Sequence, residues 1–170
     1  MAFSTVSRRA LPLLATAVLL RAQPPRLPFK LQPSQLPGVV ITLRAATTKQ
    51  GSGRDEIIIT GAGKVTLRAS TYAPAPPQER SGTVPPAAVE RLLELFALEG
   101  IETWDDAYPA KSSHYSTKVL SIELRGILQK QIVHSLSEEF PAFAHAIGAL
   151  KLLAAQACSE ALDRRFLPRL

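Results

Sequence analysis

Residues 64–72 have the sequence KVTLRASTY, in which Val65, Leu67 and Ala69 alternate with polar side chains. Successive side chains of a β-strand point to opposite faces of a sheet, so this period of two predicts a strand with one buried and one wet face. Strands of this kind are typical of antiparallel sheets that are covered on one side only. The stretch therefore predicts an antiparallel sheet with one solvent-exposed face.

Two β-branched runs precede this strand. Residues 39–43 (VVITL) and 56–60 (EIIIT) are short and lie between turn-forming segments, which predicts two more strands. Residues 61–64 (GAGK) lack the leading glycine, the following serine or threonine and the helix of a phosphate-binding loop. We therefore interpret the glycines as a tight turn and the three strands as a meander.

Helical and strand periods alternate in the second half of the chain. Residues 73–86 are rich in proline and predict a surface loop, whereas the apolar residues of 89–97 are spaced as on one face of a helix. Residues 118–124 and 127–133 predict a hairpin, and residues 137–158 predict a second helix. The order predicts an α+β fold, with an antiparallel sheet of about five strands and two helices on one face.

The first 22 residues have the layout of an export signal. The basic residues Arg8 and Arg9 precede an apolar run over 10–20, and the small residue Ala22 precedes a proline-rich break. The arginine doublet resembles a twin-arginine signal. The apolar run is shorter than the roughly 20 residues that a membrane-spanning helix requires, so we expect no integral membrane segment in the mature form. We expect the protein to be periplasmic or secreted.

Other interpretations of this leader remain open. No acidic residue occurs before Asp55, and an acid-free, arginine-bearing leader also describes an organelle transit peptide. An uncleaved tail and a start codon placed too early fit the same residues. None of these alternatives makes the mature protein a membrane protein.

The chain after the leader divides into a linker and one domain. Residues 23–37 contain five prolines and predict an extended linker, and residues 38–170 predict a single α+β domain. From Asp55 onward the chain has 12 basic and 14 acidic residues, which argues against a nucleic-acid surface. Cys158 is the single cysteine, so there is no intramolecular disulfide, and we interpret it as a small core residue.

The segment 101–116 is irregular and carries the candidate binding residues, which are Trp104, Asp105, Asp106, Tyr108 and His114. Large amphipathic aromatics in a loop can anchor an interface, although we favour the alternative in which Trp104 plugs the end of the sheet. The paired aspartates can bind a cation or exchange a proton, although loop aspartates usually cap turns. His114 lies in a loop, where functional residues often occur.

No catalytic signature accompanies these residues. The sequence has no serine in the nucleophile motif glycine, any residue, serine, any residue, glycine, and no two histidines lie three or four apart on a predicted helix. We therefore expect no enzyme, no cofactor and no metal site. The leading hypothesis is a non-enzymatic exported domain that binds a protein partner through the loop 101–116 or an exposed sheet face. The alternatives are an enzyme or enzyme accessory with its site in that loop, and a structural protein of the cell envelope.

The order of these elements resembles exported bacterial α+β domains of unknown function. It is also loosely similar to the emfourins, which are small protein inhibitors of bacterial metalloproteases. The similarity covers roughly Val39 to Ala157 and consists of a glycine-turned meander, a helix that ends in glycine, a tryptophan-aspartate-tyrosine loop, a hairpin and a final helix. The paired glycines and the phenylalanine near the start of the inhibitors have no counterpart here, so the resemblance carries over no inhibitory residue.

Overall fold

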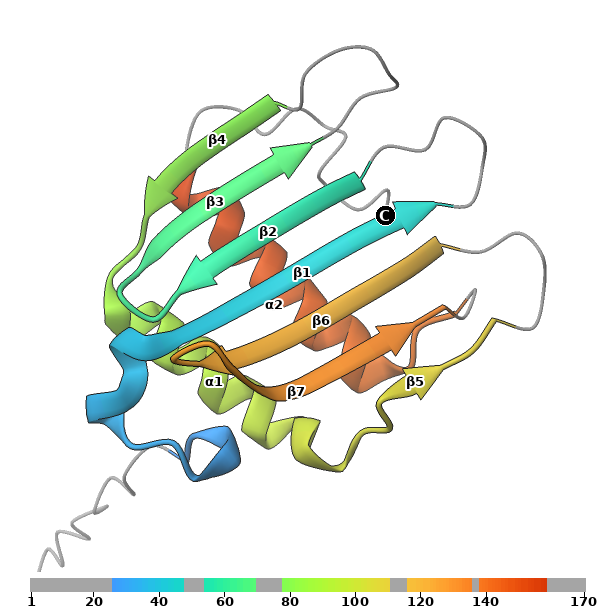
Figure 1. Cartoon of the computed structure of the whole chain (residues 1–170), viewed down its shortest axis with the longest axis horizontal. Helices are drawn as coiled ribbons and strands as arrows, with labels where there is room; N and C mark the ends of the chain where they lie inside the picture. Colours follow the sequence, from blue (N-terminus) through green and yellow to red (C-terminus); the bar gives the residue numbers. More distant parts are fainter. Residues whose placement is uncertain (1–25, 48–53, 70–77, 111–115, 136–137, 159–170) are drawn as a thin grey trace, which may run out of the picture.

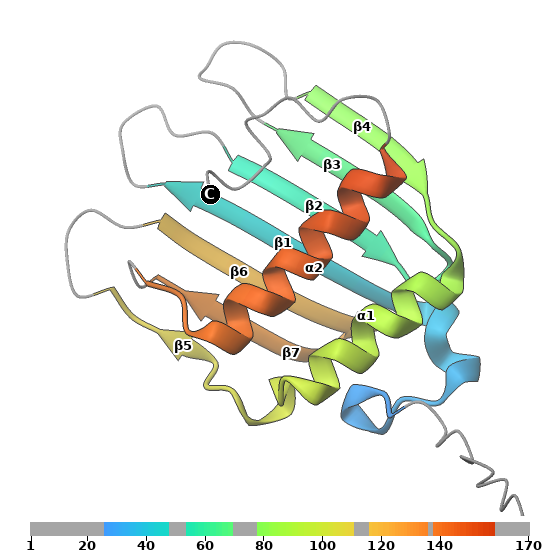
Figure 2. The same ribbon diagram turned by 180° about the vertical axis from the view of Figure 1, so that it is seen from behind.

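A computed structural model describes residues 26–47, 54–69, 78–110, 116–135 and 138–158. These residues form one seven-stranded sheet, in the spatial order β4-β3-β2-β1-β6-β7-β5. Both helices cover the same face of this sheet (Figures 1 and 2). The strands are β1 (Val39–Thr47), β2 (Arg54–Thr60), β3 (Lys64–Ala69), β4 (Gln78–Thr83), β5 (Ala107–Tyr108), β6 (Ser116–Leu124) and β7 (Ile127–His134). The helices are α1 (Pro86–Leu98) and α2 (Pro141–Ala157).

The α+β class is confirmed, but the expected sheet of about five antiparallel strands is wrong. The sheet has seven strands and is mixed, because β5 pairs in parallel with β7 while the other neighbours pair antiparallel. The first missed strand, β4, lies within the predicted loop 73–86. Its sequence QERSGT has no apolar alternation, because it is an edge strand whose side chains are mostly exposed. The second, β5, spans two residues.

The predicted meander and hairpin are confirmed. Strands β1, β2 and β3 pair in sequence, and β6 pairs with β7. At the β6–β7 turn Arg125 and Gly126 both have positive φ, of 51° and 77°. This conformation matches the twist of a two-residue hairpin and favours glycine. The backbone N–H of Arg125 donates to the carbonyl of Gly38 at 2.7 Å, so the turn is also tied to the start of β1.

The hydrophobic core lies between the sheet and the two helices. The sheet contributes apolar side chains from alternate positions, and each helix contributes one stripe, as the two periodicities predict. The fully buried members include Ile41, Ile59, Leu120, Ile122, Ile132, Leu93, Phe96, Phe143 and Leu150. Cys158 is buried at the end of α2, where the sequence predicts a small core residue. None of the described helices is both long enough and apolar enough to cross a bilayer.

The proline-rich segment before β1 is not extended where the structure describes it. Residues 28–30 and 33–38 form two 3-10 helices. Leu27, Leu31 and Leu36 are buried in the core, with at most 8% of their surface exposed. The expectation of a linker therefore does not hold from residue 26 onward, because leucines spaced four and five apart between the prolines give this segment an apolar side. Residues 1–25, with Arg8 and Arg9, lie outside the described part.

The start of α2 differs from the predicted one. The sequence places a cap at Ser137, whereas the helix begins at Pro141 and Phe140 is its N-cap residue. Proline is well suited to the first helical position, because its missing N–H would have no partner there. Residues 136–137 lie outside the described part, and Glu139 precedes the helix and contacts Lys118 of β6 instead. This contact brings a carboxylate to one end of the sheet.

Candidate functional site

The indole of Trp104 is buried beneath the end of the sheet. Its exposed fraction is 8%, and its Nε1–H donates to the carbonyl of Glu99 at 3.0 Å. The ring packs edge-on against Phe140 and Phe143, with centroids 5.2 and 6.0 Å apart. Trp104 thus closes the core, which is the alternative favoured from the sequence, and it presents no exposed ring to a partner.

The two aspartates of the loop have separate roles. The carboxylate of Asp106 lies 2.6 Å from Nζ of Lys130, which also donates to the carbonyl of Trp104 at 2.6 Å. The backbone N–H of Asp105 donates to the hydroxyl of Tyr108 at 3.0 Å. The lysine therefore fastens the loop to β7. Among the residues that the structure describes, no group of three histidine, cysteine or acidic side chains is placed to hold a metal ion.

Tyr108 meets a histidine that the sequence does not single out as functional. Tyr108 of β5 pairs with His134 of β7, and the centroids of their rings lie 5.6 Å apart. His134 is 1% exposed, and its Nε2 has no hydrogen-bond partner among the residues that the structure describes. His114 of the predicted site lies outside the described residues. The structure thus brings Trp104, Asp106 and Tyr108 to one end of the sheet, where Trp104 packs into the core and Asp106 forms an exposed ion pair with Lys130.

Charged side chains gather beneath α2 at the same end of the sheet. Asp55 of β2 and Lys118 of β6 both pair with Ala45 of β1, and Lys118 pairs in turn with His134 of β7. The three polar residues therefore form a row on the helix-covered face, in phase with the buried core positions. Glu139 contacts Lys118 Nζ, and Lys151 of α2 interacts electrostatically with Asp55 and Lys118. Asp55, Lys118, His134, Glu139 and Lys151 are called the polar row below.

Burial shifts the proton affinities of the polar row. Desolvation raises the pKa of Asp55, and the charge of Lys151 opposes this rise. Desolvation lowers the pKa of Lys151, against the attraction of Asp55. Desolvation also lowers the pKa of Lys118, and the charge of Lys151 lowers it further. For His134, desolvation and then the charge of Lys118 lower the pKa. Such opposed shifts suit proton exchange, although structural ion pairs produce them too.

The sequence contains a signal for the polar row. Asp55 comes two residues before Ile57, and Lys118 comes two residues before Leu120, so both continue the inward phase of their strands. Lys151 comes four residues after Ile147, within the apolar stripe of α2. A charge at an apolar position of the repeat is the pattern that would have identified these residues.

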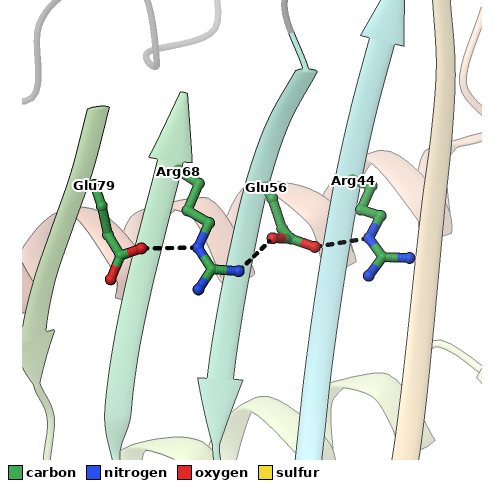
Figure 3. A network of polar contacts seen from close by, with 4 residues as sticks. All are labelled: Arg44, Glu56, Arg68 and Glu79. Carbon is green, nitrogen blue, oxygen red and sulfur yellow. Dashed lines mark hydrogen bonds and ion pairs between the residues drawn. The ribbon is translucent and has the colours of Figure 1, made fainter. Parts of the chain in front are cut away.

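The face of the sheet opposite the helices carries a second charged feature. Arg44 of β1, Glu56 of β2, Arg68 of β3 and Glu79 of β4 form one line across four neighbouring strands (Figure 3). Arg44 Nε lies 2.7 Å from Glu56 Oε1, Arg68 Nη1 lies 3.2 Å from Glu56 Oε2, and Arg68 Nε lies 2.9 Å from Glu79 Oε2. These four residues are called the ladder below.

Glu56 is the central acid of the ladder. Its side chain is 17% exposed, whereas that of Arg44 is 66% exposed. Hydrogen bonds from Arg44, and then from Arg68, lower the pKa of Glu56 against the effect of partial burial. The carboxylate therefore stays ionised at neutral pH, with each of its oxygens paired to an arginine.

Short neutral side chains lie beside the ladder on the same face. They form a parallel row across five strands, called the neutral row below, which consists of Ser81, Thr66, Ile58, Thr42 and Ser121. Ser81 is exposed and Ile58 is half-buried, whereas Thr66, Thr42 and Ser121 are buried, with 8–9% of their surface exposed. No described helix packs over this face, since both helices lie behind the sheet in Figure 1 and in front of it in the reverse view of Figure 2. This face, called the uncovered face below, therefore combines a charged line with a neighbouring row of neutral side chains that are mostly buried. Neither the models of known protein families nor the curated protein sequences match this chain.

Proposed function

We propose that the protein is a non-enzymatic module that binds a protein partner through the uncovered face of its sheet. The ladder is the observation that supports this proposal. Its four charges alternate in sign and are held in place by one another, so little side-chain entropy is lost when a partner orders them. A partner has to match this alternation, which gives specificity more than raw affinity.

The loop 101–108 is the weaker candidate for this surface. Trp104 packs into the core, and Lys130 engages Asp106 as well as the carbonyl of Trp104. The largest aromatic ring of the loop, Trp104, thus faces inward. The resemblance of the element order to the emfourins, whose targets are proteins, favours the same class of partner for this chain.

A photocrosslinker placed on each side of the sheet tests which face binds. Ser81 is exposed on the uncovered face, and Leu152 is 61% exposed on the outer side of α2. Ser81 and Leu152 are each replaced by p-benzoylphenylalanine in the full chain, which is then irradiated in its source organism. We expect a protein adduct from position 81 that is lost when Arg68→Ala is added. Equal adducts from both positions, or an adduct that Arg68→Ala leaves unchanged, would reject the proposal.

We further propose that this module acts outside the cytoplasm. The support is the leader, with Arg8 and Arg9 before an apolar run. Sequencing the amino terminus of the natural protein tests it, and we expect the mature chain to start after Ala22. A natural protein that still begins at Met1 or Ala2 in the cytosol would reject export.

The polar row favours a second candidate, an enzyme or enzyme accessory. Lysines with a lowered pKa and an acid with a raised pKa are the pattern of acid–base sites. Competitive acetylation of lysines as a function of pH, read by peptide mapping, reports each amine. Lys118 and Lys151 should become reactive at lower pH than Lys64, which is exposed on β3. Identical profiles for all three lysines would remove this candidate.

A further inference from the structure

We infer that the partner of the uncovered face is a second copy of this chain, packed sheet to sheet about a two-fold axis between β2 and β3. The inference rests on the proposed function and names its partner. From β1 to β4 the ladder has the charge order plus, minus, plus, minus. An alternating row with an even number of charges is complementary to itself when its direction is reversed.

A two-fold axis that lies parallel to the strands reverses the strand order in the second copy. It places β1 over the partner's β4, and β2 over the partner's β3. Arg44 then faces the partner's Glu79, and Glu56 faces the partner's Arg68. Each of these pairs occurs twice in the dimer, as an isologous interface requires. Every charge of the ladder therefore meets one of opposite sign.

The neutral row fits the same rotation. Thr42 lies over the partner's Ser81, and Ile58 lies over the partner's Thr66, because these residues share one register across β1 to β4. None of the four carries a charge, so no ion is left unpaired there. Thr42 and Thr66 have 9% and 8% of their surface exposed, so Ser81 and Ile58 supply most of the accessible surface of this row. Packed sheets are usually spaced about 10 Å apart.

Other occupants match this face less well. The four charges of the ladder sum to zero, so a uniformly anionic polymer or membrane surface gains nothing from it. The overlapping strands, about 4.8 Å apart and 20 Å long, give a footprint of about 400 Å² for each copy. This is below the roughly 800 Å² per partner of a standard interface, so we expect a dimer that exchanges rapidly.

A reciprocal charge exchange tests the dimer. Arg44→Glu alone places two acids opposite each other, and Glu79→Arg alone places two arginines opposite each other. An equal mixture of the two variants restores opposite charges at both positions. By sedimentation equilibrium of the full chain we expect each variant to raise the dimer Kd by at least about tenfold, and the mixture to return close to the wild-type Kd.

Matched controls carry the same charge changes on the helical side. Arg91→Glu and Glu94→Arg on α1 lie on the covered side of the sheet, away from the ladder. We expect them to leave the Kd within about twofold, since charges far from an interface mainly affect long-range attraction. Arg44 and Glu79 have side chains that are 66% and 55% exposed, so both ladder variants should fold, as circular dichroism will show.

The outcomes separate the dimer from the broader proposal. A wild-type chain that stays monomeric up to about 1 mM overturns the dimer. A mixture of the two variants that does not regain wild-type association overturns it as well. If either variant unfolds, the dimer Kd of the wild type is compared between low and high salt instead. A Kd that does not rise with salt overturns the dimer. A monomer that still forms the position-81 adduct with another protein leaves the proposed function standing, whereas a monomer without that adduct rejects both.

Discussion

The imidazole of His134 stacks on the ring of Phe143, with 4.6 Å between the centroids and 11° between the planes. Lys118 is the neighbour of His134 on β6, and its positive charge would repel a protonated imidazole. Phe140 and Tyr108 complete the aromatic surroundings, at 5.8 and 5.6 Å. This environment accommodates a neutral ring and disfavours a charged one.

We expect the folded state to lose stability as the pH falls below neutrality. Burial and Lys118 lower the pKa of His134 below its ordinary value of 6.5, so the unfolded chain takes up a proton first. The free energy of unfolding should therefore fall between pH 7.5 and 5.5, and His134→Phe should flatten this slope because it keeps the ring without the titration. Urea unfolding at both pH values measures it. An unchanged slope in the variant would assign the effect to other groups.

Asp55 contributes with the opposite sign and at lower pH. Burial raises its pKa above the ordinary value of 3.8, so the folded state takes up this proton more readily than the unfolded chain. Because Asp55 is present both in the wild type and in His134→Phe, the difference between their slopes reports the histidine.

Removing the Lys130 amine should destabilise the loop more than removing its acidic partner. Lys130→Met leaves the carbonyl of Trp104 without its donor, and we expect a loss of about 1–3 kcal/mol. Asp106→Ala removes a carboxylate that is 81% exposed, and we expect a loss within about 1 kcal/mol. Urea unfolding of both variants gives the comparison. Equal losses would contradict the assignment of Lys130 as the residue that fastens the loop.

A methyl group at Gly61 should be poorly tolerated. An added Cβ would lie 1.6 Å from the carbonyl oxygen of Leu36, a backbone atom that cannot move alone. We expect Gly61→Ala to lower the free energy of unfolding by at least about 2 kcal/mol. Gly148 on α2 is the control, because no atom lies within 4 Å of its added Cβ. Gly148→Ala should raise stability by about 0.5–1 kcal/mol through helix propensity, and a loss there would show that the helix surface is not free.

The attraction between Asp55 and Lys151 can be measured by comparing the double variant with the two single variants. Asp55→Val or Lys151→Met alone leaves a half-buried charge without its counterion, and we expect each to cost about 1–3 kcal/mol. The double variant extends the apolar phase of β2 and of α2, so we expect stability equal to or above the wild type. A double-mutant cycle by urea unfolding measures the coupling. Additive losses would show that the two charges act independently.

The predictable strands are those with one buried and one wet face. The alternation in β3 and the β-branched runs of β1 and β2 require burial of alternate side chains, and the sheet provides it. Strand β4 escaped prediction because its sequence QERSGT has no apolar phase. Its strand conformation comes from backbone hydrogen bonds to β3, which any sequence without proline can make.

The roles of the candidate residues also differ in how far the local sequence indicates them. The burial of Trp104 follows from the general preference of a large aromatic ring for the core. The role of Asp106 depends on Lys130, which is 24 residues away in the chain, so local sequence could not indicate it. The ladder escaped attention because arginine and glutamate on a wet face are individually unremarkable for a strand, and only the register aligns them.

The amino-acid sequence alone determined which segments form the meander, the hairpin and the helices, and which side of each faces the core, because periodicity and turn chemistry are local properties of a chain. Only the tertiary structure decided which strands lie next to one another and in which register. That choice places Asp55, Lys118 and His134 in one row beneath α2, and Arg44 beside Glu56 on the opposite face. Pairing between distant segments depends on the burial of the whole core, so no local pattern encodes it.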